Sequence, residues 1–447
     1  MSDSFPIFED DVLAYIQNSY IKDKDKTACG QDGDLNCQER FQRLLAVLRT
    51  PPIFSTLRMN TRLKSPEEVC WVMQDYFGQK FNVEKHKVIP DALIIKGSGP
   101  HTVPQLNDKV IVDLSCGMAV LRGAHVFAKG VMAAPSYMQP GDKVSVYADV
   151  KGKCTKGLTK PFEEGPAHFV GNGIARISRQ DLFGSNATLS GVAVEMDSAI
   201  YHCPSLSEVP ADLVFPQNLP SIVCGHVLDP QPGENVLDMC AAPGGKTTHL
   251  ACLMQSKGRV VAFDKSQQKV DKILKAAENW GLTNIKAYVF DGTKAVGENQ
   301  EANEGPPFNP ETFDRVLLDA PCSALGQRPN VYCRDKLRQV QSPPKLQKKL
   351  FTKAVELLKI GGTLVYSTCT FTTEENEDMV AWALSTFPSL KLVPQVPHIG
   401  GPGLPGTPLT KEQSSLVQRF DPSACPDYQL SADTDTIGFF CSKFIKS

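Results

Sequence analysis

The sequence predicts a doubly wound α/β domain in its C-terminal half, preceded by an α+β region into which a mostly β module is inserted. From residue 234 onward, short apolar runs alternate with helical periodicity, which is typical of a largely parallel sheet covered by helices. Earlier, short alternating runs punctuated by glycine are typical of β-strands. We expect the N-terminal region at 1–104 and 191–230, the β module at 105–190 and the α/β domain at 231–447.

Length and composition are those of a globular protein. The 447 residues suit two or three domains, since one domain commonly has about 100–200 residues. Apolar residues make up 41%, and 47 basic against 49 acidic residues leave a formal charge of −2, which excludes a uniformly basic coat but allows a local basic patch. No apolar stretch approaches the roughly 18 residues of a membrane span, and no secretory signal is readable. We therefore expect no membrane association.

The 14 cysteines indicate reduced thiols rather than disulfides or a metal centre. None are spaced as C-x-x-C, and the eight histidines are scattered along the sequence. We therefore expect no metal site, and a protein of the cytoplasm with the nucleus as the alternative. Some of the thiols should be buried and a few reactive.

Two helices are expected at the start of the N-terminal region. Apolar residues recur at helical spacing over residues 13–20 and 41–48. Between them, residues 22–26 and 30–33 are rich in lysine, aspartate and glycine, which predicts a loop.

A strand is expected next. Pro51 and Pro52 end the second helix, and residues 54–61 alternate in polarity as a strand does. We expect this strand to present Arg58 and Asn60 on its polar face.

The β module carries a basic loop. Its expected strands lie at residues 109–114, 119–121, 143–147 and 173–177. Its loop lysines are Lys151, Lys153, Lys156 and Lys160. A solvated loop explains such lysines more often than RNA contact does, so both interpretations stay open on the lysines alone.

The C-terminal half alternates strands with helices after a proline-rich, linker-like segment. Because such connections make the strands parallel, ligands should lie at their carboxyl ends. A convincing amphipathic helix covers residues 345–358, closed by Gly361 and Gly362. The expected strands are 235–239, 259–263, 285–290, 314–318, 363–367, 390–393 and 437–445, and the other helices are 244–255, 267–279 and 375–385.

A turn rich in small residues follows the first of these strands. Its sequence is Cys240-Ala241-Ala242-Pro243-Gly244-Gly245-Lys246. Small side chains let a ligand approach the backbone and the helix N-terminus. A phosphate-binding loop would need glycine at position 240, where this chain has cysteine, so nucleotide phosphate is the weaker interpretation.

Four carboxylates end successive strands of the predicted sheet: Asp238, Asp264, Asp291 and Asp319. Asp264 follows Asp238 by 26 residues, close to the spacing at which a carboxylate meets ribose hydroxyls in α/β nucleotide sites. One such residue is usually a helix cap, but four at one sheet edge favour hydroxyl, amine and cationic groups. The pattern predicts adenosine with an uncharged linkage.

Two cysteines sit just past short apolar runs, Cys322 after Asp319-Ala-Pro and Cys369 after Ser367-Thr. Thiols at neighbouring strand ends can divide covalent attack and proton removal between them, as cytosine C5 methylation requires. Thiol chemistry alone leaves open which of the two attacks.

These motifs resemble the NOL/NOP/Sun family of RNA cytosine-5 methyltransferases. The resemblance rests on residues 238–247, 318–323 and 366–370 with the following Glu374-Glu-Asn-Glu377, and it covers about residues 205–447. It implies a Rossmann-like S-adenosylmethionine-dependent methyltransferase domain and an N-terminal RNA-binding region, in which residues 51–60 resemble the family's RNA-binding strand and Arg58 and Asn60 would contact RNA. One departure is Ala324, where family members often carry glycine.

The resemblance also implies roles for single residues. S-Adenosylmethionine would lie on residues 240–246, with Asp264 on the ribose and Asp291 near the adenine. Asp319 would face the cytosine and the reacting groups, and in protonated form it could stabilise charge gathering at N3. Cys369 would be the nucleophile, and Cys322 would help to release the product.

The β module looks like a PUA domain, an RNA-binding module. A PUA domain ahead of this catalytic core resembles the family members that methylate a cytosine near the 3′ end of the tRNA acceptor stem. Arg122, Phe127 and the lysine loop would then contact RNA, since PUA domains read shape, backbone and stacking. We therefore expect tRNA as the partner of a monomeric enzyme. The alternatives are an rRNA cytosine-5 methyltransferase and a non-catalytic RNA-binding scaffold.

Overall fold

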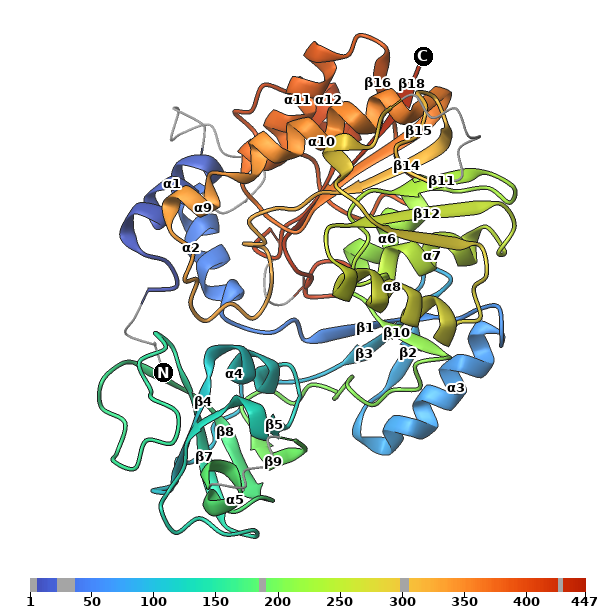
Figure 1. Cartoon of the computed structure of the whole chain (residues 1–447). Helices are drawn as coiled ribbons and strands as arrows, with labels where there is room; N and C mark the ends of the chain where they lie inside the picture. Colours follow the sequence, from blue (N-terminus) through green and yellow to red (C-terminus); the bar gives the residue numbers. More distant parts are fainter. Residues whose placement is uncertain (1–5, 22–36, 185–189, 298–304, 425–428) are drawn as a thin grey trace.

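The computed structural model describes residues 6–21, 37–184, 190–297, 305–424 and 429–447, which form three sheets and the helices around them (Figure 1). The loop predicted at 22–26 and 30–33 lies outside these residues. In the described part of the chain, no helix is long and apolar enough to cross a membrane.

The two N-terminal helices, α1 (Asp10–Tyr20) and α2 (Cys37–Leu48), confirm the predicted helices. They pack on loops of the C-terminal domain rather than on the N-terminal sheet. Ile16 and Phe41 share one buried cluster with Leu325 and Phe371, which lie two to three residues from the two cysteines of interest. The helices therefore support the loops that carry those thiols.

The N-terminal sheet has the strand order β10-β1-β3-β2 and is covered by α3 (Pro66–Phe77). Ser65 and Glu68 cap α3 reciprocally, which fixes its start. The edge strand β10 comes from far along the chain and pairs with β1, so the β module is an insertion in this sheet, as predicted. The strands are β1 (Phe54–Met59), β2 (Val83–Lys85), β3 (Ala92–Lys96) and β10 (Val214–Pro216).

The β module is a six-stranded sheet in the order β5-β9-β8-β7-β4-β6. It packs on the C-terminal domain through Val331 and Tyr332, which belong to its buried core. Its strands are β4 (Lys109–Asp113), β5 (Val126–Phe127), β6 (Val131–Ala133), β7 (Lys143–Asp149), β8 (Ala167–Ala175) and β9 (Val192–Ala199), and its helices are α4 (Leu114–Leu121) and α5 (Arg179–Phe183).

Two expectations for the module were wrong. Residues 119–121 end helix α4 rather than forming a strand, because Asp113 caps the helix and Gly117 lets it approach Ala148 closely. The module also extends to Ala199, beyond the boundary expected at residue 190, because β9 pairs with both β5 and β8.

The C-terminal domain is built on a sheet in the order β13-β12-β11-β14-β15-β18-β16, with β17 also paired to β18. The first five strands are parallel and β18 is antiparallel to its neighbours. The strands are β11 (Asn235–Asp238), β12 (Arg259–Asp264), β13 (Ile285–Val289), β14 (Phe313–Asp319), β15 (Leu358–Thr368), β16 (Leu390–Leu392), β17 (Gln418–Phe420) and β18 (Phe439–Lys446). This confirms the predicted doubly wound α/β domain.

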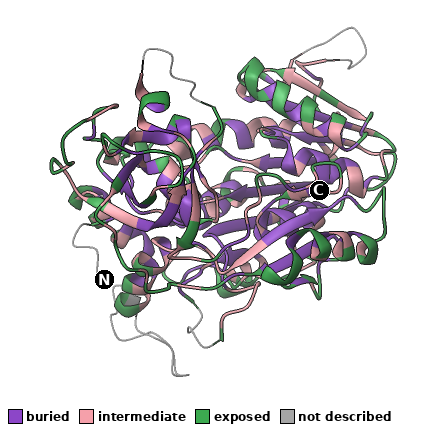
Figure 2. Cartoon of the chain, turned by 90° about the horizontal axis from the view of Figure 1, so that it is seen from below, coloured by how far each residue is buried: buried purple, intermediate pink, exposed green. Residues whose placement is uncertain are grey.

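Helices cover both faces of this sheet, and its central strands are buried, as the purple ribbon in Figure 2 shows. One layer holds α6 (Leu219–Leu228), α7 (Gly245–Leu253) and α8 (Gln267–Asn279). The other holds α10 (Pro343–Leu357) and α11 (Glu377–Thr386). The short helices α9 (Leu337–Val340) and α12 (Lys411–Leu416) lie in connecting segments. Helix α6 falls in the segment expected to be a linker, because Asn218 caps it and Pro220 suits its first turn.

Candidate active site

Two thiols lie side by side at the carboxyl edge of the central sheet. Cys322 follows β14 and Cys369 follows β15, and these strands are parallel neighbours that pair Asp319 with Ser367. The Sγ atoms of Cys322 and Cys369 are 3.4 Å apart, and both cysteines are free thiols. The structure therefore brings together the pair that the sequence predicted at neighbouring strand ends.

The two thiols have different environments. A hydrogen bond from Cys322 lowers the pKa of Cys369, and Gln327 and Lys246 act in the same direction. The same bond raises the pKa of Cys322 well above its usual value, and burial adds to the effect. Since the thiolate is the nucleophile, the geometry favours Cys369 for attack.

Asp319 is held by two neighbours. Lys246 Nζ lies 2.6 Å from Asp319 Oδ2, and Ser367 Oγ donates to Asp319 Oδ1 at 2.7 Å. Burial works against a charged Lys246, but the Asp319 carboxylate outweighs it and raises the pKa of the amine. The amine and the hydroxyl together fix the orientation of the Asp319 side chain beside the two thiols.

The loop that carries Cys322 is fixed by Glu375, which the sequence did not single out for a role. Ser323 donates its backbone N to Glu375 Oε2 at 3.1 Å and its Oγ to Glu375 Oε1 at 2.5 Å. Gln347 on α10 also donates to this carboxylate, at 2.8 Å. Burial raises the pKa of Glu375. Two acidic residues in a row at 374–375 are a weak signal, because most such pairs lie on the surface.

A cavity of about 510 Å³ opens in front of Cys369. Its walls come from the N-terminal sheet, the small-residue turn and the C-terminal strand β18. Arg122 of the β module also lines it. The lining includes Phe54, Ser55, Thr56, Phe215, Asn218, Asp238, Cys240, Lys246, Asp319, Gln327, Arg328, Cys369 and Phe439. Of these, Gln327, Arg328 and Phe439 were not recognised from the sequence, because their motif context carries no chemical signal.

The small-residue turn fits the predicted cofactor. Gly244 has φ of 103°, and a Cβ there would lie 3.0 Å from Ile273 Cα, so the tight turn needs glycine. A Cβ on Gly245 would come within 2.9 Å of Phe215. Burial raises the pKa of the Cys240 thiol well above its usual value, so this cysteine is a packing residue rather than a nucleophile. The turn can present backbone and the α7 N-terminus to a ligand.

The strand-end carboxylates lie at one sheet edge, as expected, in different surroundings. Asp264 accepts from the backbone N of Ala242 and Lys265 at 3.3 and 2.7 Å, which places it against the turn. Burial raises the pKa of Asp238 to about 7, and its Oδ1 has no hydrogen-bond partner among the described residues. Such acceptors fit the hydroxyl and amine groups of an adenosine-containing cofactor. Asp291 is half-exposed and bonds to Thr293, and neither it nor Asp264 lines the cavity in front of Cys369.

Comparison with known proteins decides the family. A family model described as 16S rRNA methyltransferase RsmB/F matches residues 225–403. A mouse (Mus musculus) protein named tRNA (cytosine(72)-C(5))-methyltransferase NSUN6 is 46% identical over 98% of this chain and 95% of its own length. The chain belongs to the NOL/NOP/Sun family of RNA cytosine-5 methyltransferases.

Other relatives of this family agree over the whole length. A crystal structure of NSun6 from Pyrococcus horikoshii with SFG matches with a TM-score of 0.78 and 28% identity, covering 99% of each chain. An Arabidopsis thaliana protein named rRNA (cytosine-C(5))-methyltransferase NOP2C is 30% identical over 99% of this chain. The likeness to both extends through the β module and the N-terminal sheet.

Two of the residues expected to bind RNA in this family member are buried instead. Arg58 and Asn60 are fully inaccessible. Arg58 donates to Gln217 Oε1 at 2.8 Å and to Thr248 Oγ1 at 2.7 Å, and its guanidinium lies 4.1 Å from the Trp280 ring centroid. The prediction was wrong because an alternating strand shows which residues share a face but not what covers that face.

The remaining expected RNA contacts are on the surface. Arg122 is exposed at the edge of the cavity, and Phe127 is 43% exposed on the β module. Lys153, Lys156 and Lys160 are exposed, and the exposed Lys151 lies over the ring of Tyr332.

The histidines are less scattered in space than in sequence. His226 on α6 and His249 on α7 both meet Asp91, a grouping that could in principle bind a metal ion and that the sequence did not predict.

Proposed function

We propose that this protein transfers a methyl group from S-adenosylmethionine to C5 of a cytosine near the 3′ end of the tRNA acceptor stem. The observation that carries the catalytic part is the Cys322–Cys369 pair, 3.4 Å apart beside Asp319 and Lys246. The substrate rests on likeness to proteins named for cytosine 72 of tRNA, one from mouse at 46% identity over 98% of this chain and one from Pyrococcus horikoshii at 32% over 86%. An intact site of this kind argues against a non-catalytic scaffold.

The cofactor would lie on residues 240–246, with Asp264 accepting from the ribose and Asp291 close to the adenine. When bound, it supplies an electrophilic methyl group. That the Pyrococcus horikoshii NSun6 structure contains SFG, an S-adenosylmethionine analogue, supports this choice.

Cys369 begins the reaction. Its thiolate adds to C6 of the cytosine, which turns the poorly nucleophilic C5 into an enamine carbon. Negative charge that develops at the pyrimidine N3 and O2 during this addition needs hydrogen-bond donors. Lys246, which lies against Asp319 and acts on Cys369, is a charged donor at this place. Asp319 orients that amine.

Cys322 completes the reaction. Once Cys369 has bonded to C6 it no longer accepts from Cys322, so the interaction that most strongly raises the pKa of Cys322 disappears. Cys322 can then lose its own proton to solvent water, and the resulting thiolate removes the proton from the methylated C5. The electron pair of that C–H bond forms the C5–C6 double bond again, and the Cys369 sulfur leaves.

The β module is, in this proposal, a PUA domain that selects tRNA. Its six-stranded sheet, its insertion ahead of the catalytic core and its exposed basic loop support this assignment. Because the module packs beside Val331 and Tyr332 and contributes Arg122 to the cavity, RNA held by it would reach the thiols.

Cellular setting and assembly are also proposals. The cysteines whose side chains the structure describes are free thiols, which suits the reducing cytoplasm. We propose a cytoplasmic monomer. Fractionation of cells that express the tagged chain, and light scattering of the purified protein, would test these two points; an organelle-restricted signal or a stable dimer would contradict them.

The function is tested by incubating the enzyme and cofactor with tRNA transcripts and total ribosomal RNA, followed by base-resolution mapping of 5-methylcytosine. A single modified cytosine near the 3′ end of the acceptor stem is expected, and transcripts without the terminal CCA show whether that end is needed. Modification of rRNA alone would favour the second candidate, an rRNA enzyme, which the likeness to NOP2C supports. No modification of any RNA would exclude the enzyme.

A further inference from the structure

The first turn of α7 is held by four different parts of the molecule. Successive side chains from 246 to 249 each meet a partner on another element. Lys246 Nζ lies 2.6 Å from Asp319, Thr247 donates to Asp238 at 2.7 Å, Thr248 accepts from Arg58 at 2.7 Å, and His249 Nε2 lies 2.8 Å from Asp91. Two of these partners belong to the catalytic sheet and two to the N-terminal sheet region.

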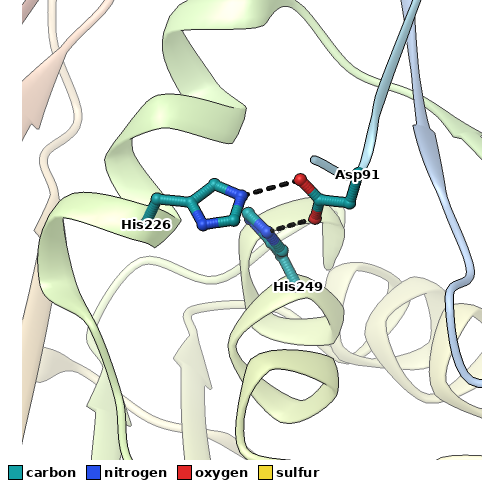
Figure 3. A group of neighbouring side chains, drawn as sticks. All are labelled: Asp91, His226 and His249. Carbon is teal, nitrogen blue, oxygen red and sulfur yellow. Dashed lines mark hydrogen bonds and ion pairs between the residues drawn. The ribbon is translucent and has the colours of Figure 1, made fainter. Parts of the chain in front are cut away.

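Asp91 joins three elements. It precedes β3, and Figure 3 shows its carboxylate facing His226 on α6 with one oxygen and His249 on α7 with the other. His226 Nε2 lies 2.7 Å from Asp91 Oδ1, and His249 Nε2 lies 2.8 Å from Oδ2. The carboxylate is almost inaccessible, and His249 is fully buried.

Burial and mutual contact shift the pKa values of the groups in this cluster. Burial lowers the pKa of His249 to about 4, so its ring is neutral at physiological pH. Burial alone would raise the pKa of Asp91, but the two imidazoles outweigh it and lower that pKa, so Asp91 is a carboxylate. This negative charge also acts on the buried Arg58. The His249 ring packs directly on Gly225 of α6, where a Cβ would lie 2.3 Å from Nδ1, so this close approach of α6 and α7 needs glycine.

The distances between the Asp91 oxygens and the two histidine nitrogens can be compared with those in a zinc site. Zinc binds histidine nitrogen and carboxylate oxygen at about 2.0–2.2 Å in a tetrahedron, which separates ligand atoms by roughly 3.3 Å. The nitrogen–oxygen separations here are 2.7 and 2.8 Å. His226 makes a hydrogen bond to Asp91. His249 Nε2 makes a close polar contact without hydrogen-bond geometry, since it has no hydrogen-bond partner among the described residues. Both separations are shorter than those between two ligands of one zinc ion, and we call the cluster a carboxylate clasp on two helices.

We propose that Asp91 is a positioning residue for Lys246. By holding His226 and His249 it sets the first turn of α7 against the N-terminal sheet. Lys246 and His249 are three residues apart and therefore neighbours on one helix face. Phe54, Ser55 and Thr56 of β1 line the cavity opposite Lys246, so the same clasp sets the distance between its two walls. The inference rests on the proposed methyltransferase function.

Single-turnover methylation by the full-length enzyme at saturating cofactor tests this role. Asp91→Ala should lower the rate about tenfold or more while the tRNA dissociation constant changes less than about twofold, because a small misplacement of a reacting group costs rate more than binding. Asp91→Asn should keep most of the rate, since its amide can accept from one imidazole and donate to the other.

The chain offers a matched control. His86, in the same segment before β3 as Asp91, has its Nε2 2.7 Å from Asp433 Oδ1. In the described part of the chain, the side-chain hydrogen bonds of His86 go to Asp433 and to the backbone N of Val88 and Ile89 rather than to α7. Asp433→Ala should therefore leave the rate within about twofold of the wild type. Thermal unfolding and cofactor affinity, measured for each variant, show that it is folded.

Whether Asp91 acts through Lys246 is tested by combining substitutions at the two residues. In a Lys246→Arg background, Asp91→Ala should lower the remaining rate far less than it does alone, because coupled residues are not additive. Three results would each overturn the proposal. The first is an Asp91→Ala variant that lowers the methylation rate by the same factor in both backgrounds. The second is an Asp433→Ala variant that lowers the rate as much as Asp91→Ala does, and the third is one tightly bound zinc ion per purified chain. A wild-type enzyme that methylates no RNA would instead overturn the proposed function.

Discussion

Cys322 and Cys369 lie 3.4 Å apart at the ends of two parallel neighbouring strands, and the hydrogen bond between them makes their acidities unequal. The bond lowers the pKa of Cys369 and raises that of Cys322. Cys369, the thiol with the lowered pKa, also lines the cavity. An unequal pair of this kind has a nucleophile and a proton acceptor built into one contact.

The acidity difference predicts an order of alkylation. A lowered pKa keeps a thiolate populated as the pH falls, so Cys369 should react with iodoacetamide at a lower pH than Cys322 does. Peptide mass spectrometry after short exposures from pH 6 to 9 measures both. In Cys322→Ala the curve for Cys369 should move to higher pH, because its donor is lost; a curve that stays in place would contradict the role of this bond.

Two substitutions in the loop that carries Cys322 should change the free energy of unfolding in opposite directions. Ala324 has φ of 54°, a left-handed conformation that costs a residue with a Cβ about 1 kcal/mol. Ala324→Gly should therefore raise the free energy of unfolding by about that amount. Gly326→Ala should lower it by about 2 kcal/mol, because the new Cβ would lie 2.1 Å from Gly438 O. Thermal and urea unfolding measure both, and a destabilised Ala324→Gly would show that the loop is not strained.

Arg58 should matter for stability and not for RNA affinity. Arg58→Ala removes its bonds to Gln217 and Thr248 and its packing on Trp280, and it should cost about 2–4 kcal/mol of unfolding free energy. The exposed Arg122→Ala should cost less than about 0.5 kcal/mol. If folded Arg58→Ala binds tRNA much more weakly than the wild type, Arg58 contributes to RNA binding and not only to stability.

The lysine loop should contribute to tRNA binding through charge. Replacing the exposed Lys153 and Lys156 with glutamine should weaken binding and reduce the slope of log affinity against log salt by about 1–2, with cofactor affinity unchanged. The exposed Lys391→Gln, on β16 at the far edge of the catalytic sheet, is the control. An unchanged slope would remove this loop from the RNA interface.

The catalytic centre was predictable because its residues occupy short contiguous motifs at the ends of parallel strands. Alternation of strands and helices places those ends at one edge, so the positions of Cys322, Cys369 and Asp319 follow from local pattern. The ion pair between Lys246 and Asp319 did not follow, because it depends on how the first turn of α7 faces β14.

Contacts between distant segments explain what the sequence did not reveal. Asp91 and His226 are 135 residues apart, and no local pattern relates them. Arg58 on an alternating strand has the same appearance whether its face meets RNA or α7. Residues 119–121 have the apolar run of a strand, but the capped turn from Asp113 onward makes them the end of a helix.

The division of labour between the two thiols is tested most directly by trapping. Enzyme, cofactor and tRNA are incubated, denatured, and resolved for protein that carries RNA. Cys322→Ala should accumulate a denaturant-stable adduct, because Cys369 can add to C6 but the C5 proton is not removed; Cys369→Ala should form none. An adduct in Cys369→Ala and none in Cys322→Ala would reverse the two roles.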